Sequence, residues 1–199
     1  MKDRKKTATW TDVKARLGRM DRPGLLGVIR DLYEASNPNR RFLHARFAAE
    51  TPVIEEYRRL VTDAVFPDPL SRRQIRLRDA NATIAEYKRA TGDLGGTVDL
   101  MLEFVEAGTE QSVDLGYGDD AYFAALERKV EEVVRSLDAL PEAGRRSATA
   151  RLIKLGEHRG EIGWGYGDFL GDVATRLLGS STSRAPAPGS RSPRRRLSR

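Results

Sequence analysis

The segment from Gly156 to Asp168 gathers more chemically active residue types than any other part of the chain. Its glycines permit positive φ angles and let a ligand approach the backbone closely. Its polar and aromatic side chains are Glu157, His158, Glu161, Trp164, Tyr166 and Asp168. One interpretation is a ligand- or anion-binding loop at the N-terminus of the last helix. The alternative is a tight turn between two helices, with Trp164 and Tyr166 packed beneath it.

Two further patterns in the sequence could hold a metal ion or move a proton. His158 and Glu161 could be metal ligands one helical turn apart, but the order is the reverse of the Glu-x-x-His pair of di-iron bundles, and it occurs once. The chain has two histidines and no cysteine, so we expect no metal site and no cofactor. Asp99, Glu103 and Glu106 share one helical face, where we expect a solvated surface rather than acid–base chemistry.

Motifs for nucleophilic or phosphate chemistry are absent from the sequence. It contains no Gly-x-Ser-x-Gly, no Ser-x-x-Lys and no Walker-type Gly-x4-Gly-Lys-Ser/Thr, which are the spacings that such chemistry uses. The dinucleotide fingerprint also fails, because Asp168 stands where its third glycine should be. We therefore expect no enzymatic activity.

Arginine clusters are the remaining candidates, as contacts to a polyanion. The net charge is +6, and all of it comes from the arginines after residue 178, since residues 1–178 sum to zero. Residues 1–91 are basic and residues 92–140 are strongly acidic. The candidate polyanion contacts are Arg72, Arg73 and Arg76 on a predicted helix, and Arg191, Arg194, Arg195 and Arg196 in the tail. The alternative for the helix is a solvated face that pairs with neighbouring acids.

Helix signals recur along the chain and would position these residues. Ser71 is predicted to cap a helix that ends at Gly92. A nearly all-apolar helix, which we expect to be central, is predicted over 97–107 and ends at Gly108. A polar loop over 109–118 then leads to a helix over 119–140. That helix has apolar residues at helical spacing, and we expect these to line the core: Leu126, Val130, Val133 and Leu137.

The N-terminal region predicts three shorter helices. Thr11 is expected to cap the first. The second begins near Asp21 and Pro23, and Asn37 and Pro38 begin the third. The apolar residues of the first are predicted to face inward: Val13, Leu17 and Met20. Those of the second recur at helical spacing, and the start of the third precedes further apolar residues: Leu25, Val28, Ile29, Leu32 and Tyr33 in the second, and Phe42, Leu43 and Phe47 in the third.

Two of these stretches resemble a bacterial protein family of unknown function. The first is the N-terminal pattern of Val13, Leu17, Leu25, Ile29 and Asp31–Tyr33 with Phe42, Leu43 and Phe47. The second is the stretch from Ile162 to Asp172. The resemblance covers about residues 10–178. It implies an all-helical domain and supplies no activity, ligand or catalytic residue.

The pattern as a whole predicts an all-α protein of eight or nine mostly short helices in antiparallel hairpins, forming a bundle or a short solenoid-like stack. We expect a flexible basic N-terminus over 1–10, one helical domain over 11–178 and a disordered Arg/Ser/Pro-rich tail over 179–199. No apolar run is long enough to span a bilayer and no signal peptide is present, so we expect a cytoplasmic protein.

Three function hypotheses remain open at this point. The first is a non-enzymatic helical protein-interaction module with a charge-divided surface, which binds a protein partner or a second copy. The second is a weak, non-specific nucleic-acid-associated protein that acts through its arginine-rich tail. The third is a small-ligand binder or enzyme centred on the Gly156–Asp168 loop.

Overall fold

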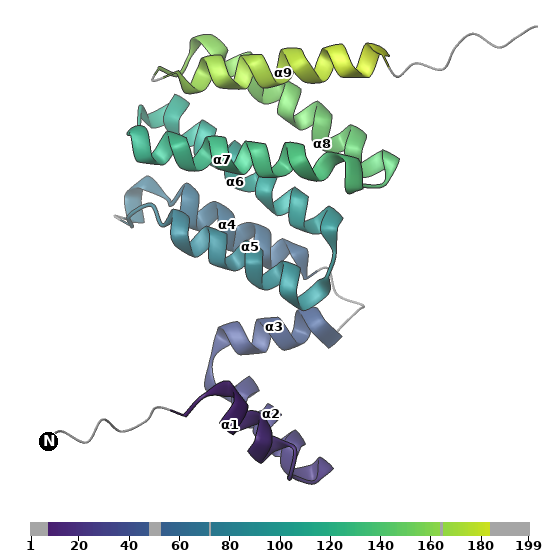
Figure 1. Ribbon diagram of the computed structural model, residues 1–199. Coiled ribbons are helices and arrows are strands. Elements are labelled where there is room, and N and C mark those ends of the chain that lie inside the picture. Colours follow the sequence, from purple (N-terminus) through teal and green to yellow (C-terminus); the bar gives the residue numbers. More distant parts are fainter. Residues whose placement is uncertain (1–7, 48–52, 72, 164, 184–199) are drawn as a thin grey trace, which may run out of the picture.

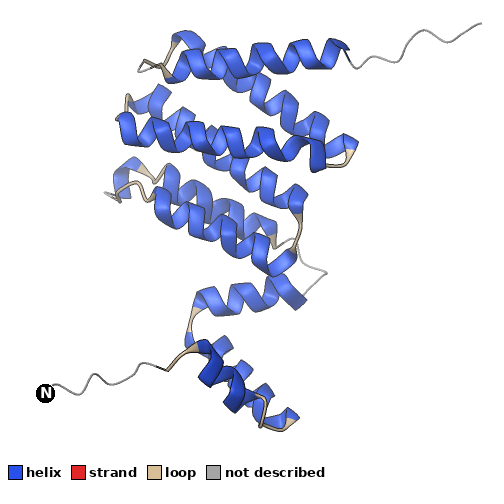
Figure 2. Ribbon diagram, in the orientation of Figure 1, coloured by secondary structure: helices blue, strands red, loops and turns tan. Residues whose placement is uncertain are grey.

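The computed structural model describes residues 8–47, 53–71, 73–163 and 165–183, and within them it contains helices and no strand (Figure 2). The described helices are α1 Trp10–Leu17, α2 Arg22–Ala35, α3 Asn37–Phe47, α4 Ile54–Val65, α5 Leu77–Thr91, α6 Leu94–Leu115, α7 Asp120–Ser136, α8 Glu142–Leu155 and α9 Tyr166–Ser183. The single turns of 3-10 helix are η1 Pro69–Ser71, η2 Leu137–Ala139 and η3 Gly156–Gly160. The all-α prediction is confirmed.

The helices pack as successive hairpins laid one on another (Figure 1). The pairs are α2 with α3, α4 with α5, α6 with α7 and α8 with α9. The first helices of the last three pairs also contact one another, α4 with α6 and α6 with α8. Contacts of this kind, mainly between neighbouring hairpins, are typical of a short solenoid-like stack rather than of a bundle around one axis.

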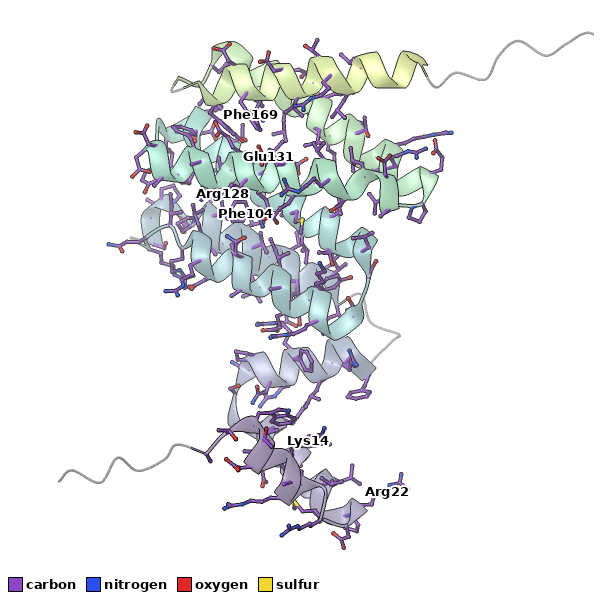
Figure 3. The ribbon with its side chains drawn as sticks, viewed as in Figure 1. Lys14, Arg22, Phe104, Arg128, Glu131 and Phe169 are labelled. Carbon is purple, nitrogen blue, oxygen red and sulfur yellow. The ribbon has the colours of Figure 1, made fainter. Side chains whose placement is uncertain are left out.

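Helix α6 is the central element, as its composition predicts. It is buried on the sides that face α4, α5 and α7, with Leu100, Phe104 and Val105 fully inside. Leu126, Val130 and Val133 of α7 are also fully buried and Leu137 nearly so, which confirms the predicted core face of that helix. Figure 3 shows Phe104 between the ribbons of the stack, whereas Arg128 and Glu131 of α7 belong to its exposed side.

The C-terminal end of α6 differs from the sequence-based prediction. Helix α6 does not end at Gly108 but continues to Leu115, so most of the predicted loop over 109–118 is helical. Gly108 is instead a point of close approach: a Cβ there would lie 2.5 Å from Leu126 Cδ2 of α7. The helix ends at Gly116, whose φ of 62° is the left-handed conformation that glycine adopts without strain.

The ends of the described chain also differ in detail from the prediction. Thr9, and not Thr11, caps α1, through a reciprocal pair of hydrogen bonds with Asp12. Helix α9 continues to Ser183, so the first residues of the predicted tail are helical. Residues 1–7 and 184–199 lie outside the described residues.

The close approach at Gly108 generates a stability prediction. Gly108→Ala should lower the free energy of unfolding by about 1 kcal/mol or more, because overpacking a buried contact costs more than the helix propensity of alanine returns. Gly27→Ala is the matched control, since nothing lies within 4 Å of a Cβ at that helical position. It should leave stability unchanged or raise it by up to about 1 kcal/mol. Urea denaturation measures both, and equal effects of the same sign would contradict the close packing of α6 on α7.

Candidate functional site

The structure separates the residues of the glycine-rich segment instead of gathering them in one pocket. Tyr166 is fully buried at the start of α9, where its hydroxyl lies 3.0 Å from the Thr109 hydroxyl. Its ring stacks on Phe123 with centroids 5.3 Å apart. Burial raises the pKa of Tyr166 far above its ordinary value, so the phenol stays neutral. Tyr166 thus packs beneath the turn, as the alternative interpretation expects.

The other residues of that segment lie nearer the surface. His158 Nδ1 and Glu161 Oε2 are 2.5 Å apart. Glu157 and Asp168 are exposed, and Trp164 lies outside the described residues. In the described part of the chain, no three His, Asp or Glu side chains are placed to hold a metal ion. The structure therefore pairs His158 with Glu161 but does not bring Tyr166 or Asp168 to them.

A cleft of about 380 Å³ lies between α6 and α8, close to this pair. Glu106, Glu110 and Asp114 line its α6 side, and Lys154 and His158 line the opposite side. Acidic groups thus face basic ones across the opening.

Next to the cleft, five charged residues of three helices form what we call the ion cluster: Arg58 of α4, Asp99, Glu103 and Glu106 of α6, and Arg151 of α8. Arg151 Nε donates to Glu106 Oε1 at 2.7 Å, and the same guanidinium bonds Asp99. Arg58 bonds Asp99 from the other side and reaches Glu103 at 3.6 Å. The carboxylates expected on a solvated face are therefore partly buried and bridged by two arginines.

The ion cluster joins the first helices of three hairpins. The hydrogen bond to Glu106 raises the pKa of Arg151, and the bond to Asp99 raises that of Arg58. Both guanidinium groups therefore stay charged at any physiological pH. Every carboxylate of the cluster is within reach of a guanidinium, as structural ion pairs require, and none is left facing open solvent alone. We interpret the ion cluster as a structural link between α4, α6 and α8.

A second polar contact attaches α3 to the stack. The Arg41 guanidinium donates two hydrogen bonds to Glu86 of α5, at 2.8 and 3.1 Å, and both side chains are largely buried. The Tyr57 hydroxyl donates to the same carboxylate at 2.9 Å, and burial raises its pKa. Arg46 donates to the carbonyl groups of Arg89 and Ala90 at the end of α5. We call this group of contacts the α3 clamp.

The N-terminal helices themselves are the largest departure from the sequence-based prediction. The apolar residues of α1 were expected to face inward and those of α2 and α3 to recur at helical spacing, yet none of the apolar side chains of these helices is buried. Ile29 is 45% exposed and Phe47 is 76% exposed. Helix α3 packs on α5, whereas α2 has no comparable contact with α4. Helix α3 covers part of the apolar stripe of α2, but Leu26, Ile29 and Leu32 remain exposed.

An apolar groove of about 480 Å³ runs between α2 and α3. Leu26, Ile29 and Tyr33 of α2 form one wall, and Leu43 and Phe47 of α3 form the other. The Tyr33 hydroxyl and His44 Nε2, 2.9 Å apart, connect the two walls, and Arg30 and His44 also line the groove. Sequence reasoning missed this groove because its residues have the spacing of an ordinary core.

The predicted arginine face is also rearranged. Helix α5 begins at Leu77 rather than after Ser71, so Arg73 and Arg76 precede it and do not share a face with Lys88 and Arg89. Arg76 Nη1 pairs with Asp79 at 3.3 Å, and its backbone N–H donates to the Ala64 carbonyl. The remaining candidate polyanion contacts lie outside the described residues: Arg72, Arg191, Arg194, Arg195 and Arg196.

Comparisons with protein-family models, with curated proteins and with solved structures each found no match to the chain. The chain is all-helical, but these comparisons identify no family for it. In the part of the chain that the structure describes, no helix combines the length and the apolar character that crossing a bilayer requires.

The ion cluster generates the second prediction. Arg151→Met should lower the free energy of unfolding by about 1–3 kcal/mol, because it leaves the partly buried Glu106 without a counter-charge and removes one of the two arginines that bond Asp99. Arg146→Met on the same helix is the matched control. Arg146 pairs with Glu142 at 2.7 Å but is 78% exposed, so its loss should cost less than about 1 kcal/mol. Urea denaturation of both variants measures the difference, and equal losses would show that the ion cluster does not link the helices.

Proposed function

We propose that the protein is a non-enzymatic helical interaction module that binds another protein with its N-terminal helices. The observation that carries this proposal is the uncovered apolar surface of α1, α2 and α3. Of the eleven large apolar side chains that are exposed in the described residues, seven belong to the first 47 positions: Trp10, Val13, Met20, Leu26, Ile29, Leu32 and Phe47. An apolar concentration of this kind on a water-soluble surface is typical of a binding site.

The two ends of the stack differ, and the difference supports the proposal. Stacked-helix proteins need a polar outer face on their terminal units to remain soluble. Helix α9 has one, with Asp172, Thr175 and Arg176 exposed and Leu178 as its exposed large apolar residue. The N-terminal end has instead an apolar surface that the described residues leave open. Short helices without buried side chains gain little stability from tertiary packing, so a partner would also stabilise α1 and α2.

The two other hypotheses have less support from the described residues. The arginines expected along one helical face do not share it, and the tail lies outside the described residues. The residues of the glycine-rich segment do not converge on one point. Weak polyanion binding through the tail, and ligand binding or catalysis centred on the Gly156–Asp168 loop, both stay predictions.

An affinity experiment tests the proposed function. Full-length protein is immobilised and incubated with an extract of its source cells, next to the variants Ile29→Asp and Leu70→Asp. Leu70 is 90% exposed in η1, outside the N-terminal helices, so Leu70→Asp is the matched control. Because Ile29 is half exposed, Ile29→Asp should change the free energy of unfolding by less than about 1 kcal/mol.

The expected result is at least one protein retained by the parent and by Leu70→Asp but lost from Ile29→Asp. Circular dichroism and urea denaturation confirm that both variants are folded. If Ile29→Asp retains the same proteins as the parent, or if the parent retains none specifically, the N-terminal surface is not a binding site and the proposal fails.

A further inference from the structure

We infer that the groove between α2 and α3 binds an acidic amphipathic helix of a partner protein. This inference rests on the proposed function and names the class of partner. It combines three features of the described residues: the shape of the groove, the apolar side chains along it, and the positive charges at its edges.

The shape of the groove favours a helix over an extended peptide. Its walls are two antiparallel helices whose backbone groups are already bonded within each helix, so an extended peptide would find no strand edge to pair with. A helix satisfies its own backbone groups and inserts side chains between the two walls. Helix α2 has 14 residues, which is about 21 Å and matches a partner helix of about four turns.

The apolar side chains supply anchors at the right spacing. Leu26, Ile29 and Tyr33 stand at positions i, i+3 and i+7 of α2, and Leu43 and Phe47 stand one turn apart on α3. A partner helix with large apolar residues at i, i+3, i+4 and i+7 would place them in the space between these two rows.

The charges at the groove select an acidic partner. Arg30 lines the groove. Arg22 lies one turn before Leu26 and Arg40 one turn before Leu43, both just outside this lining, and the Arg40 guanidinium is 5.3 Å from the centre of the Tyr33 ring. Among the described residues, neither Arg22 nor Arg40 has a carboxylate partner, and Arg30 pairs only with the exposed Glu34. Residues 8–47 contain eight basic and four acidic side chains. Figure 3 shows Arg22, and Lys14 of α1, on the N-terminal helices away from the stack.

The same features argue against other occupants. A second copy docked through the same surface would oppose these arginines with an identical set. The opposite end of the stack offers exposed Asp172, Thr175 and Arg176 instead of a row of apolar anchors. The chain's own residues 184–199 are rich in arginine and contain one large apolar residue, Leu197. An anionic membrane would meet the positive charge, but a flat surface does not fill a concave groove.

A displayed peptide library tests the inference. Each member is an 18-residue helix with apolar residues fixed at i, i+3, i+4 and i+7, and with Asp, Glu, Lys, Arg, Ser and Gln randomised at the other positions. Selection uses the full-length protein, with counter-selection on Ile29→Asp. The expected result is enrichment of Asp and Glu beside the anchors. The best peptide should lose at least about tenfold in affinity on Ile29→Asp, a change of about 1.4 kcal/mol, and less than twofold on Leu70→Asp.

A charge exchange isolates the electrostatic contribution. The double variant Arg22→Glu/Arg40→Glu should weaken the acidic peptide about tenfold, and a peptide with Lys in place of its Asp and Glu should bind the variant more tightly than the parent. The matched control is Arg73→Glu/Arg128→Glu, which reverses two exposed arginines elsewhere and should change affinity less than twofold. Raising the salt concentration should weaken the acidic peptide on the parent protein.

Several outcomes overturn the inference. Enrichment of neutral or basic positions excludes an acidic partner, and so does the failure to select any peptide that depends on Ile29. A dimer in sedimentation that Ile29→Asp dissociates assigns the groove to a second copy. Binding to phosphatidylserine vesicles that Ile29→Asp abolishes assigns it to a membrane surface. If the peptides fail but the extract still contains an Ile29-dependent protein, only the partner class is wrong; if both fail, the proposed function fails with it.

Discussion

Helix α6 has to be apolar on the sides that its neighbours bury while it carries a row of carboxylates between α4 and α8. These two requirements determine much of how the helices are packed. Its apolar sides are buried by the neighbouring helices, with Leu100, Phe104 and Val105 fully inside. Its acidic side pairs with Arg58 of α4 and with Arg151 of α8. The ion cluster therefore aligns α4, α6 and α8, and the second helix of each pair packs beside them.

Local patterns explain which parts of the fold are predictable. Helix type, the core face of α7 and the central place of α6 follow from residue spacing within single segments. The length of α6 cannot be predicted in this way. In the sequence Gly108 indicates a helix end, whereas in the structure it is the point where Leu126 of α7 packs closely against α6. The ion cluster also escapes prediction, since Arg58 and Asp99 are 41 positions apart and Arg151 and Asp99 are 52 apart. No short-range pattern encodes pairs of that separation.

The N-terminal groove shows a different limit of sequence reasoning. Leu26, Ile29 and Tyr33 have the spacing of a core-facing stripe, and that spacing cannot say whether the covering element belongs to the same chain. The structure supplies the missing fact, because among the described helices only α3 makes several contacts with α2. For the glycine-rich segment, the sequence allowed either a ligand-binding loop or a tight turn with packed aromatic residues. The complete burial of Tyr166 favours the tight turn at that position. The sequence of a single turn does not show which of its residues are buried, because that depends on where the next helix packs.

The α3 clamp has a consequence for how the molecule opens. The contacts of α4 to α9 are apolar, extensive and spread over many side chains, whereas the N-terminal helices are joined to them largely through α3, with the hydrogen bonds of Arg41 and Arg46 prominent among its contacts. Water competes for such bonds far more effectively than for a buried apolar cluster. We therefore expect α1 to α3 to have lower local stability than α6 and α7 in the free protein, and their amide hydrogens to exchange with solvent first. Binding of the proposed partner would then also stabilise these helices.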